Sequence, residues 1–196
     1  MKIHKILENP AVYDTCQKIL SFIAAGNKGM GNFLEETLGS GTGSILDIGC
    51  GTGRFAKIFG GRYTGIDNNP QYIACAKKYA PEGNFFVADS SDVGFLNRQF
   101  DYVLSICTFH HLSDEQVKKT VARMKEMANK KIFIIDPVYP PLFNILGYLL
   151  FKLDRGQYRR TFDQLNKLLE PAGFKPLVLR LKQSFPYRIC VFEFQK

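Results

Sequence analysis

The chain of 196 residues is 45% hydrophobic and 22% charged, which is typical of a soluble globular protein with one domain. Its net charge of +8 is carried entirely by residues 113–196, because residues 1–112 hold 10 basic and 10 acidic side chains. Five scattered cysteines without a Cys-x-x-Cys pair disfavour structural zinc and a disulfide framework. The longest apolar stretch, residues 140–151, is shorter than the ~20 residues of a membrane helix, and no export signal is visible. We therefore expect a cytoplasmic protein without a transmembrane span.

Apolar strands and helical patterns alternate along most of the chain. Before the first strand, the periodicity predicts helices over residues 10–25 and 30–38. Strands are expected at residues 44–49, 63–67, 84–89, 100–109 and 130–137, and helices at residues 54–60, 70–79 and 113–128. Ser113 should cap the last of these helices, with Gln116 three residues on. Such alternation is the pattern of a parallel sheet with helices on both faces.

The spacing changes after the last of these strands. Residues 138–160 form a long connection, and connections of this length are usually functional. A helix is expected at residues 161–174, and strands at 175–182 and 188–195 are too close for a crossover helix, so they should pair antiparallel at the sheet edge. The sequence thus predicts an α/β fold, a Rossmann-like three-layer sandwich whose seven-stranded, mostly parallel sheet has an antiparallel C-terminal strand.

The stretch "ILDIGCGTG" at residues 45–53 puts three glycines after a buried strand, which leaves backbone amides bare for a ligand. A dinucleotide fingerprint requires a further glycine where Arg54 stands, and the Gly-Lys-[Ser/Thr] of a P-loop does not follow. Phosphate ligands of these two kinds are therefore disfavoured. Another ligand that needs such a bare loop is a cofactor that carries both an amino acid and an adenosine, and this candidate remains.

With these residues assembled, the chain resembles the class I S-adenosylmethionine-dependent methyltransferases over nearly its whole length. In that family "LDIGCGTG" lies against the methionyl part of the cofactor, and "YTGIDNNP", "FFVADSSD" and "LSICTFHHL" match the stations for the ribose, the adenine and the methionyl group. The resemblance implies S-adenosylmethionine as cofactor and a single methyltransferase domain. Its parts would be N-terminal helices (1–40), a cofactor-binding core (44–137), a substrate-side insertion (138–160) and a C-terminal helix and hairpin (161–196).

The same resemblance gives roles to three acidic residues. Asp47 would organise the site around the amino group, Asp67 would hold both ribose hydroxyls, and Asp89 would contact the adenine amino group. The implied cofactor-binding residues are Asp47, Gly49, Cys50, Gly51, Gly53, Asp67, Asn68, Asp89, Ser90 and Cys107. Asp67 and Asp89 also suit helix caps, and Cys50 suits a small space-filling side chain better than a nucleophile.

His110 and His111 follow the fourth strand, where the family's acceptor lies. The acceptor must lose a proton during methyl transfer, and a histidine can take that proton near neutral pH. Neighbouring side chains point in different directions, so we expect His110 as the catalytic base; a packed, hydrogen-bonded histidine is the alternative. Candidate substrate residues are Tyr13, His111, Asp136, Tyr139, Arg155 and Tyr158. Only His4 remains as a further histidine, so we expect no metal ion.

The insertion pairs an apolar stripe with a basic cluster. The stripe is Leu142, Phe143, Leu146, Leu149 and Leu150, and the cluster is Lys152, Arg155, Arg159 and Arg160. Such a segment can cover a hydrophobic acceptor, hold an acidic group, lie on an anionic membrane or pack as a buried helix with a solvated end. The stretches "ENPAVYDTCQ" and "LDRGQYRR" look like those of an uncharacterised bacterial subgroup of the family, which implies a small-molecule or lipid-pathway enzyme.

The expected reaction is therefore methyl transfer to a hydroxyl or amine of a small or lipid-like molecule, which can be acidic. Nucleobase methylation is disfavoured, because "CTFHH" stands where an Asp-Pro-Pro-Tyr box would lie and a Pro-Cys nucleophile is absent. The basic second half keeps RNA methylation as an alternative. A cofactor-binding regulatory protein without transfer activity is the other alternative, and the sequence predicts no oligomeric state.

Overall fold

The computed structural model describes residues 26–39, 41–152, 154, 156–177 and 188–196. The helix predicted over residues 10–25, with Tyr13 in it, lies outside the described residues, and so does Arg155.

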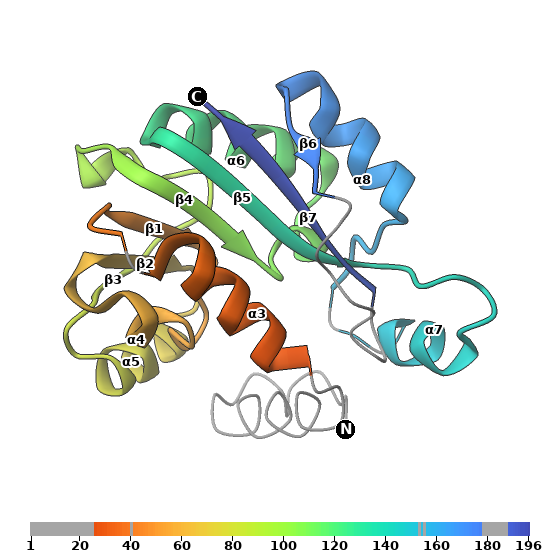
Figure 1. Ribbon diagram of the computed structural model, residues 1–196, viewed down its shortest axis with the longest axis horizontal. Coiled ribbons are helices and arrows are strands. Elements are labelled where there is room, and N and C mark those ends of the chain that lie inside the picture. The colour runs from red at the N-terminus through yellow and green to blue at the C-terminus, as the bar shows by residue number, and fades with distance from the viewer. Residues whose placement is uncertain (1–25, 40, 153, 155, 178–187) are drawn as a thin grey trace.

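The described residues form a seven-stranded sheet in the order β3-β2-β1-β4-β5-β7-β6, shown in Figure 1. Its strands are β1 (Ile45–Ile48), β2 (Tyr63–Asp67), β3 (Asn84–Val87), β4 (Phe100–Ile106), β5 (Ala128–Val138), β6 (Lys175–Pro176) and β7 (Arg188–Gln195). The strands β1 to β5 pair in parallel, and β7 runs antiparallel to both β5 and β6. The predicted mostly parallel sheet with an antiparallel C-terminal strand is confirmed.

The strand order changes direction at β1, which lies between β2 and β4. Open α/β sheets bind ligands at such a point, outside the carboxyl ends of the strands. All four residues of β1, including Asp47, are buried, because apolar cores lie on both faces of the strand. The glycine loop that follows β1 therefore starts at the ligand-binding edge of the sheet.

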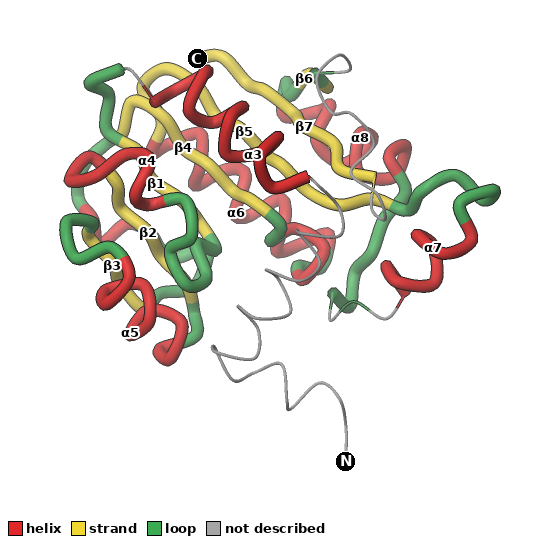
Figure 2. The backbone as a smooth tube through the Cα atoms, turned by 60° about the horizontal axis from the view of Figure 1, so that its bottom comes forward, coloured by secondary structure: helices red, strands yellow, loops and turns green. Residues whose placement is uncertain are grey.

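Helices cover both faces of the sheet, as Figure 1 and Figure 2 show. They are α3 (Gly26–Leu34) with a π-helical turn η1 (Glu35–Gly39), α4 (Ala56–Phe59), α5 (Pro70–Tyr79), α6 (Asp114–Met127), α7 (Ile145–Lys152) and α8 (Phe162–Leu169). Side chains of α3, α4 and α5 form one core with Ile45 of β1, and side chains of α6 and α8 form the other with Leu46. Successive residues of β1 thus face opposite layers, as the pleat requires.

Local side-chain caps explain where the main helices begin. The predicted cap at Ser113 is confirmed: its Oγ accepts a hydrogen bond from the Gln116 N–H at 3.3 Å, and the Gln116 side chain accepts one from the Ser113 N–H at 2.8 Å. Thr161 and Gln164 form the same capping box at α8. Several boundaries differ from the prediction: α3 begins at Gly26, β5 runs from Ala128 to Val138, and β4 ends at Ile106, where Cys107 turns the chain with a φ of +54°.

The insertion contains α7, which stands apart from the sheet in Figure 1 and in Figure 2. It follows β5 and precedes α8 in the chain. Among the described residues, no helix has both the length and the apolar character needed to cross a membrane.

Candidate functional site

The glycine loop after β1 has two packed glycines and one that borders open space. Gly49, Gly51 and Gly53 all have positive φ, at 81°, 55° and 72°, which is a backbone conformation that favours glycine. A Cβ on Gly49 would lie 2.2 Å from the Thr108 Oγ1, and one on Gly53 would lie 2.9 Å from the Ala76 Cβ. A Cβ on Gly51 would meet no atom within 4 Å. The protein's own packing therefore requires Gly49 and Gly53, whereas the space beside Gly51 suits a ligand.

We expect Gly51→Ala to weaken S-adenosylmethionine binding far more than it destabilises the fold. The strain of positive φ for alanine costs about 1–2 kcal/mol, and the added methyl group enters the space left for the ligand. Gly60→Ala is the matched control, since Gly60 also has a positive φ (56°) and open space around its Cβ but precedes β2 at the opposite edge of the sheet. Calorimetric titration should show weaker binding in the first variant only; equal losses in both would contradict a ligand at Gly51.

Asp67 connects the glycine loop to the end of β2. Its Oδ2 accepts a hydrogen bond from the Gly51 N–H at 2.9 Å, and its Oδ1 accepts one from the Asn69 N–H at 2.8 Å. A carboxylate can accept several hydrogen bonds at once, so the same group can hold the loop and two neighbouring hydroxyls. Asn68 beside it is exposed. The geometry is compatible with the ribose role expected for Asp67.

Asp47 lies under the loop with one carboxyl oxygen unsatisfied. The side chain is 2% exposed, and its Oδ2 accepts a hydrogen bond from the Tyr63 hydroxyl at 2.5 Å. No partner for its Oδ1 is found among the described residues. Burial raises the pKa of Asp47 to about 7. The hydrogen bond from Tyr63 lowers this pKa, and the negative charge of Asp67 raises it. An orphaned buried carboxylate oxygen suits a cationic donor, so the site fits a cofactor with an ammonium group.

The affinity for S-adenosylmethionine is expected to rise between about pH 5.5 and about pH 7. Asp47 carries a pKa of about 7, so its attraction for an ammonium group grows as it ionises over this range. Both pH values lie below the pKa of ~7.7–8.0 of an α-amino group, so the ammonium group of the ligand keeps its positive charge. Titration calorimetry on the wild type and Asp47→Asn should show the rise in the wild type alone; the same rise in both proteins would rule out this role.

The predicted adenine station is less enclosed. Asp89 is exposed, and its Oδ1 accepts hydrogen bonds from the Ser91 N–H at 2.9 Å and the Ser91 hydroxyl at 2.7 Å. The Ser90 hydroxyl lies 3.0 Å from the Thr120 hydroxyl on α6, so it faces the helix layer. An adenine contact by Asp89 or Ser90 stays a prediction.

Cys107 and Cys50 contribute to the loop edge in different ways. Cys107 is exposed and has positive φ, a conformation that is uncommon for a residue with a side chain and often marks functional sites. Cys50 is buried, and a Cβ on Gly65 would lie 2.7 Å from its Sγ, so the thiol fills space over β2. Burial and then the charges of Asp47 and Asp67 raise the pKa of Cys50, which keeps the thiol protonated and unreactive.

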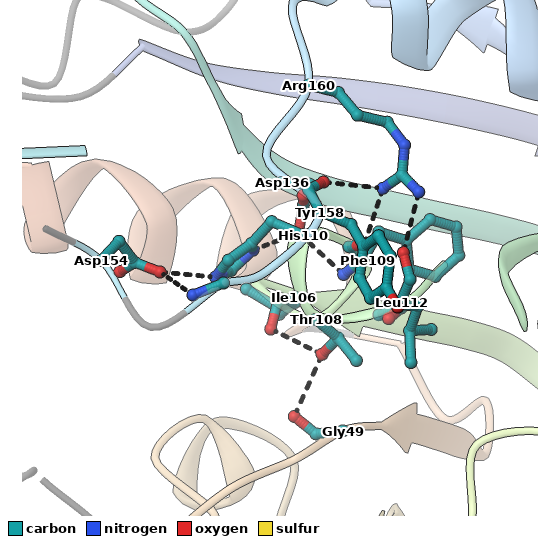
Figure 3. A network of polar contacts seen from close by, with 12 residues as sticks. Gly49, Ile106, Thr108, Phe109, His110, Leu112, Asp136, Asp154, Tyr158 and Arg160 are labelled. Carbon is teal, nitrogen blue, oxygen red and sulfur yellow. Dashed lines mark hydrogen bonds and ion pairs between the residues drawn. The ribbon is translucent and has the colours of Figure 1, made fainter. Parts of the chain in front are cut away.

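His110 lies between two carboxylates, as Figure 3 shows. The ring is 4% exposed; its Nδ1 lies 3.1 Å from the Asp136 Oδ1 and its Nε2 lies 3.3 Å from the Asp154 Oδ1. Burial disfavours the charged ring, but the two carboxylates outweigh this penalty and raise the pKa of His110 to about 9. Burial would raise the pKa of Asp154, yet His110 lowers it to about 2. At neutral pH the ring is therefore an imidazolium that donates from both nitrogens.

A strap, defined as residues 154 and 156–160, holds the turn that carries His110. A Cβ on Gly156 would lie 2.3 Å from the His110 Cδ2, and the Tyr158 N–H donates to the His110 carbonyl at 2.9 Å. Arg160 is buried and donates to the carbonyls of Phe109 at 2.9 Å and Leu112 at 2.8 Å. The strap thus fixes both the backbone and the ring of His110.

Sequence reasoning did not find the roles of Asp154 and Arg160. The stretch "LDRGQYRR" was the available signal, but it pointed to Arg155 and Tyr158 as pocket residues. Arg160 was expected in a cluster for an acidic ligand or a membrane, whereas its guanidinium bonds the 109–112 turn and Asp114. Arg159 likewise donates to the carbonyl of Asp154 at 2.7 Å.

Most of the described substrate candidates gather around His110. Asp136 is 2% exposed and also accepts from the Phe109 N–H at 3.0 Å, so it orients the ring from the end of β5. The exposed His111 has its ring centroid 4.1 Å from that of His110. Tyr139 is half-buried, and Tyr158 is 42% exposed. Their contact with a substrate stays a prediction.

One group of described residues has the composition of a cation site. The ligand atoms of His110, His111 and Asp154 lie within 4.8 Å of one another. An imidazolium has no lone pair to offer a metal, so the pKa of about 9 at His110 disfavours ion binding at neutral pH. The expectation of a reaction without metal stays a prediction.

Comparisons with known proteins agree with this geometry. A family model described as "Methyltransferase domain" matches residues 45–131. An uncharacterized methyltransferase of Bacillus cytotoxicus is 30% identical over 166 residues, which cover 82% of this chain and 70% of the relative. One from Bacillus cereus is 26% identical over 168 residues, covering 83% and 71%.

Solved structures share the fold. Magnesium protoporphyrin IX methyltransferase from Synechocystis, with bound S-adenosylhomocysteine, superposes with a TM-score of 0.70 at 15% identity, covering 97% of this chain and 96% of that one. A plantazolicin methyltransferase in complex with a desmethyl analogue of plantazolicin and S-adenosylhomocysteine gives 0.64 at 17% identity, covering 95% and 89%. The Bacillus cytotoxicus relative, the matching family model and the shared fold show that the chain belongs to the class I S-adenosylmethionine-dependent methyltransferases.

Proposed function

We propose that this methyltransferase acts on a hydroxyl or amine of a small or lipid-like molecule, with His110 as the base. The observation that carries the proposal is the buried His110 ring between Asp136 and Asp154, next to the end of β4. Cys107 at that end is the station expected for the methionyl group, so the ring is close to where an acceptor would lie.

The two carboxylates have different parts in this proposal. Asp136 is buried at the end of β5 and keeps a proton on Nδ1, which leaves Nε2 for the acceptor. The Asp154 side chain is 28% exposed on the strap, so an incoming acceptor can displace it. With that partner gone, burial lowers the pKa of His110, the Nε2 proton passes to solvent, and the Nε2 lone pair can then take the acceptor's proton.

The reaction balances with these groups. S-adenosylmethionine supplies an electrophilic methyl group and leaves as its neutral thioether, which keeps the electron pair of the broken bond. The acceptor oxygen or nitrogen gives its electron pair to the methyl group and its proton to His110. Positioning by the buried ring and exclusion of water by the strap supply much of the remaining acceleration.

Apolar side chains support a lipid-like acceptor. The Tyr139 ring packs against Tyr148 and Phe151 of α7, with centroids 5.1 Å away in each case. Phe151 in turn lies 6.4 Å from the His110 ring by centroids. Aromatic side chains of the insertion therefore lie beside the candidate site residues.

Methyl-labelled cofactor and extract of the source cell test the proposal. After incubation with the protein, the extract is separated into organic-soluble, small aqueous and RNA fractions. Label in either of the first two fractions supports the proposal, and label in RNA would establish the RNA alternative instead. Cofactor binding without label in any fraction would favour the regulatory alternative.

A further inference from the structure

We propose that α7 and the turn before it dock on the surface of an anionic lipid bilayer. The turn and helix together, residues 142–152, are called the apolar finger below. The inference deepens the proposed function, because its link to a lipid-like acceptor rests on that function, whereas the docking itself does not.

The apolar finger exposes a run of large hydrophobic side chains. Their exposed fractions are 84% for Leu142, 82% for Phe143, 68% for Ile145, 53% for Leu146 and 52% for Leu149. Between them, the Asn144 side chain is occupied with capping the helix, where its Oδ1 accepts from the Gly147 N–H at 2.9 Å. Contiguous apolar surface of this kind is rare on soluble monomers and marks interaction sites.

The inner face of the same helix is firmly packed, so the outer face has a defined direction. Phe151 is fully buried, and its ring meets Tyr139 edge to face with centroids 5.1 Å apart. Gly147 is buried as well. A helix that is apolar on both faces needs an apolar medium on its outer side, and in Figure 1 α7 points away from the sheet.

The positive charge of the second half of the chain favours an anionic bilayer as the partner of the apolar finger. Lys152 is exposed at the end of α7 and is the only charged residue in positions 138–152. The whole net charge of +8 lies in residues 113–196. Exposed apolar side chains beside a lysine, with no acid in positions 138–152, match the headgroup boundary of an anionic leaflet. Long lysine side chains reach the headgroups while their stems stay in apolar surroundings.

Docking would place the acceptor side of the site against the membrane. The apolar finger contacts Tyr139 with its inner face and reaches His110 through Phe151. A lipid-like acceptor could then pass from the bilayer to the site along apolar side chains. This step is the part that depends on the proposed function.

Vesicle sedimentation of the full chain without cofactor tests the docking. The probes are phosphatidylcholine vesicles with and without phosphatidylglycerol, at low and high salt. The wild type should sediment with the anionic vesicles, less at high salt. The double variant Phe143→Glu/Leu146→Glu should lose at least roughly tenfold in vesicle affinity. Phe95→Glu is the matched control, because Phe95 is 51% exposed beside β3 at the far edge of the sheet; it should bind like the wild type.

A second pair of variants tests the charge. Lys152→Glu should weaken binding to anionic vesicles, and Lys78→Glu, an exposed lysine at the end of α5, should not. S-adenosylmethionine titration of every variant checks that it is folded. Equal sedimentation of the double variant and the Phe95 control, or no sedimentation at low salt, would overturn the docking.

Two further outcomes separate the alternatives. A dimer in light scattering that the double variant dissociates, without vesicle binding, would assign the apolar finger to a second copy and overturn the proposal. Vesicle binding together with label transfer to a water-soluble acceptor would uphold the docking and refute only the lipid-like acceptor.

Discussion

His110→Ala is expected to lower kcat by roughly 10²-fold or more, the usual contribution of a general base, while the affinity for S-adenosylmethionine stays within about twofold. The ring contacts Asp136 and Asp154, on the proposed acceptor side, whereas the loop and Asp67 form the proposed cofactor site. Steady-state kinetics with the labelled acceptor fraction, and calorimetry with the cofactor, measure the two quantities. Unchanged turnover would remove the base role.

The alanine variant leaves two carboxylates without their cation, so its folding needs a control. The folded pKa of His110 is about 9, above the reference of 6.5. Its pairing therefore stabilises the fold fully below pH 6.5, and this contribution is lost as the pH rises through about 9. Unfolding by denaturant should show a loss of stability in the variant at neutral pH that shrinks above pH 9. His111→Ala, which changes the exposed neighbour, is the matched variant and should keep its stability.

The pH profile distinguishes a base from a structural histidine. Only about one per cent of a group with a pKa of about 9 is neutral at pH 7, so kcat/KM should rise nearly tenfold per pH unit up to about 9. Asp154→Asn removes one of the carboxylates that raise this pKa, so its profile should shift to lower pH. A profile that is flat from pH 7 to pH 9, or identical in both proteins, would contradict the base role.

Asp67→Asn is expected to weaken binding of S-adenosylhomocysteine by at least roughly 10²-fold. Hydrogen bonds to a charged group contribute about 1.5–3 kcal/mol each, and every 1.4 kcal/mol is tenfold in affinity. The Gly51 N–H donates to the Asp67 Oδ2, where the variant can present an amide donor in place of an acceptor. The loss therefore combines a weaker ribose contact with a loosened loop.

A ligand analogue separates these two causes. An S-adenosylhomocysteine that lacks the 2′-hydroxyl should bind the wild type more weakly than the parent compound does. Asp67→Asn should bind both compounds almost equally, because the contact is already gone. If the variant still discriminates between them as the wild type does, Asp67 holds the loop and not the ribose.

Local sequence patterns were enough to determine the order in which strands and helices follow one another along the chain in the core of this protein. The strand Tyr63–Asp67 and the helix Pro70–Tyr79 were predicted at their observed bounds, and the cap at Ser113 was predicted with its Gln116 partner. Short apolar runs, helical periodicity and caps depend on residues only a few positions apart. The same local motifs, in order, were sufficient to identify the cofactor and the family.

The surroundings of His110 were decided only by the tertiary structure. Its partner Asp154 comes from the strap after α7. Arg160 was expected in a surface cluster, but it is buried and donates hydrogen bonds to two carbonyls of the 109–112 turn. No periodicity encodes these contacts, since they follow from how the insertion folds back on the end of β4 and from the need of buried carbonyls and carboxylates for donors. The pKa of a histidine depends on that assembled environment, so its protonation could not be read from the chain alone.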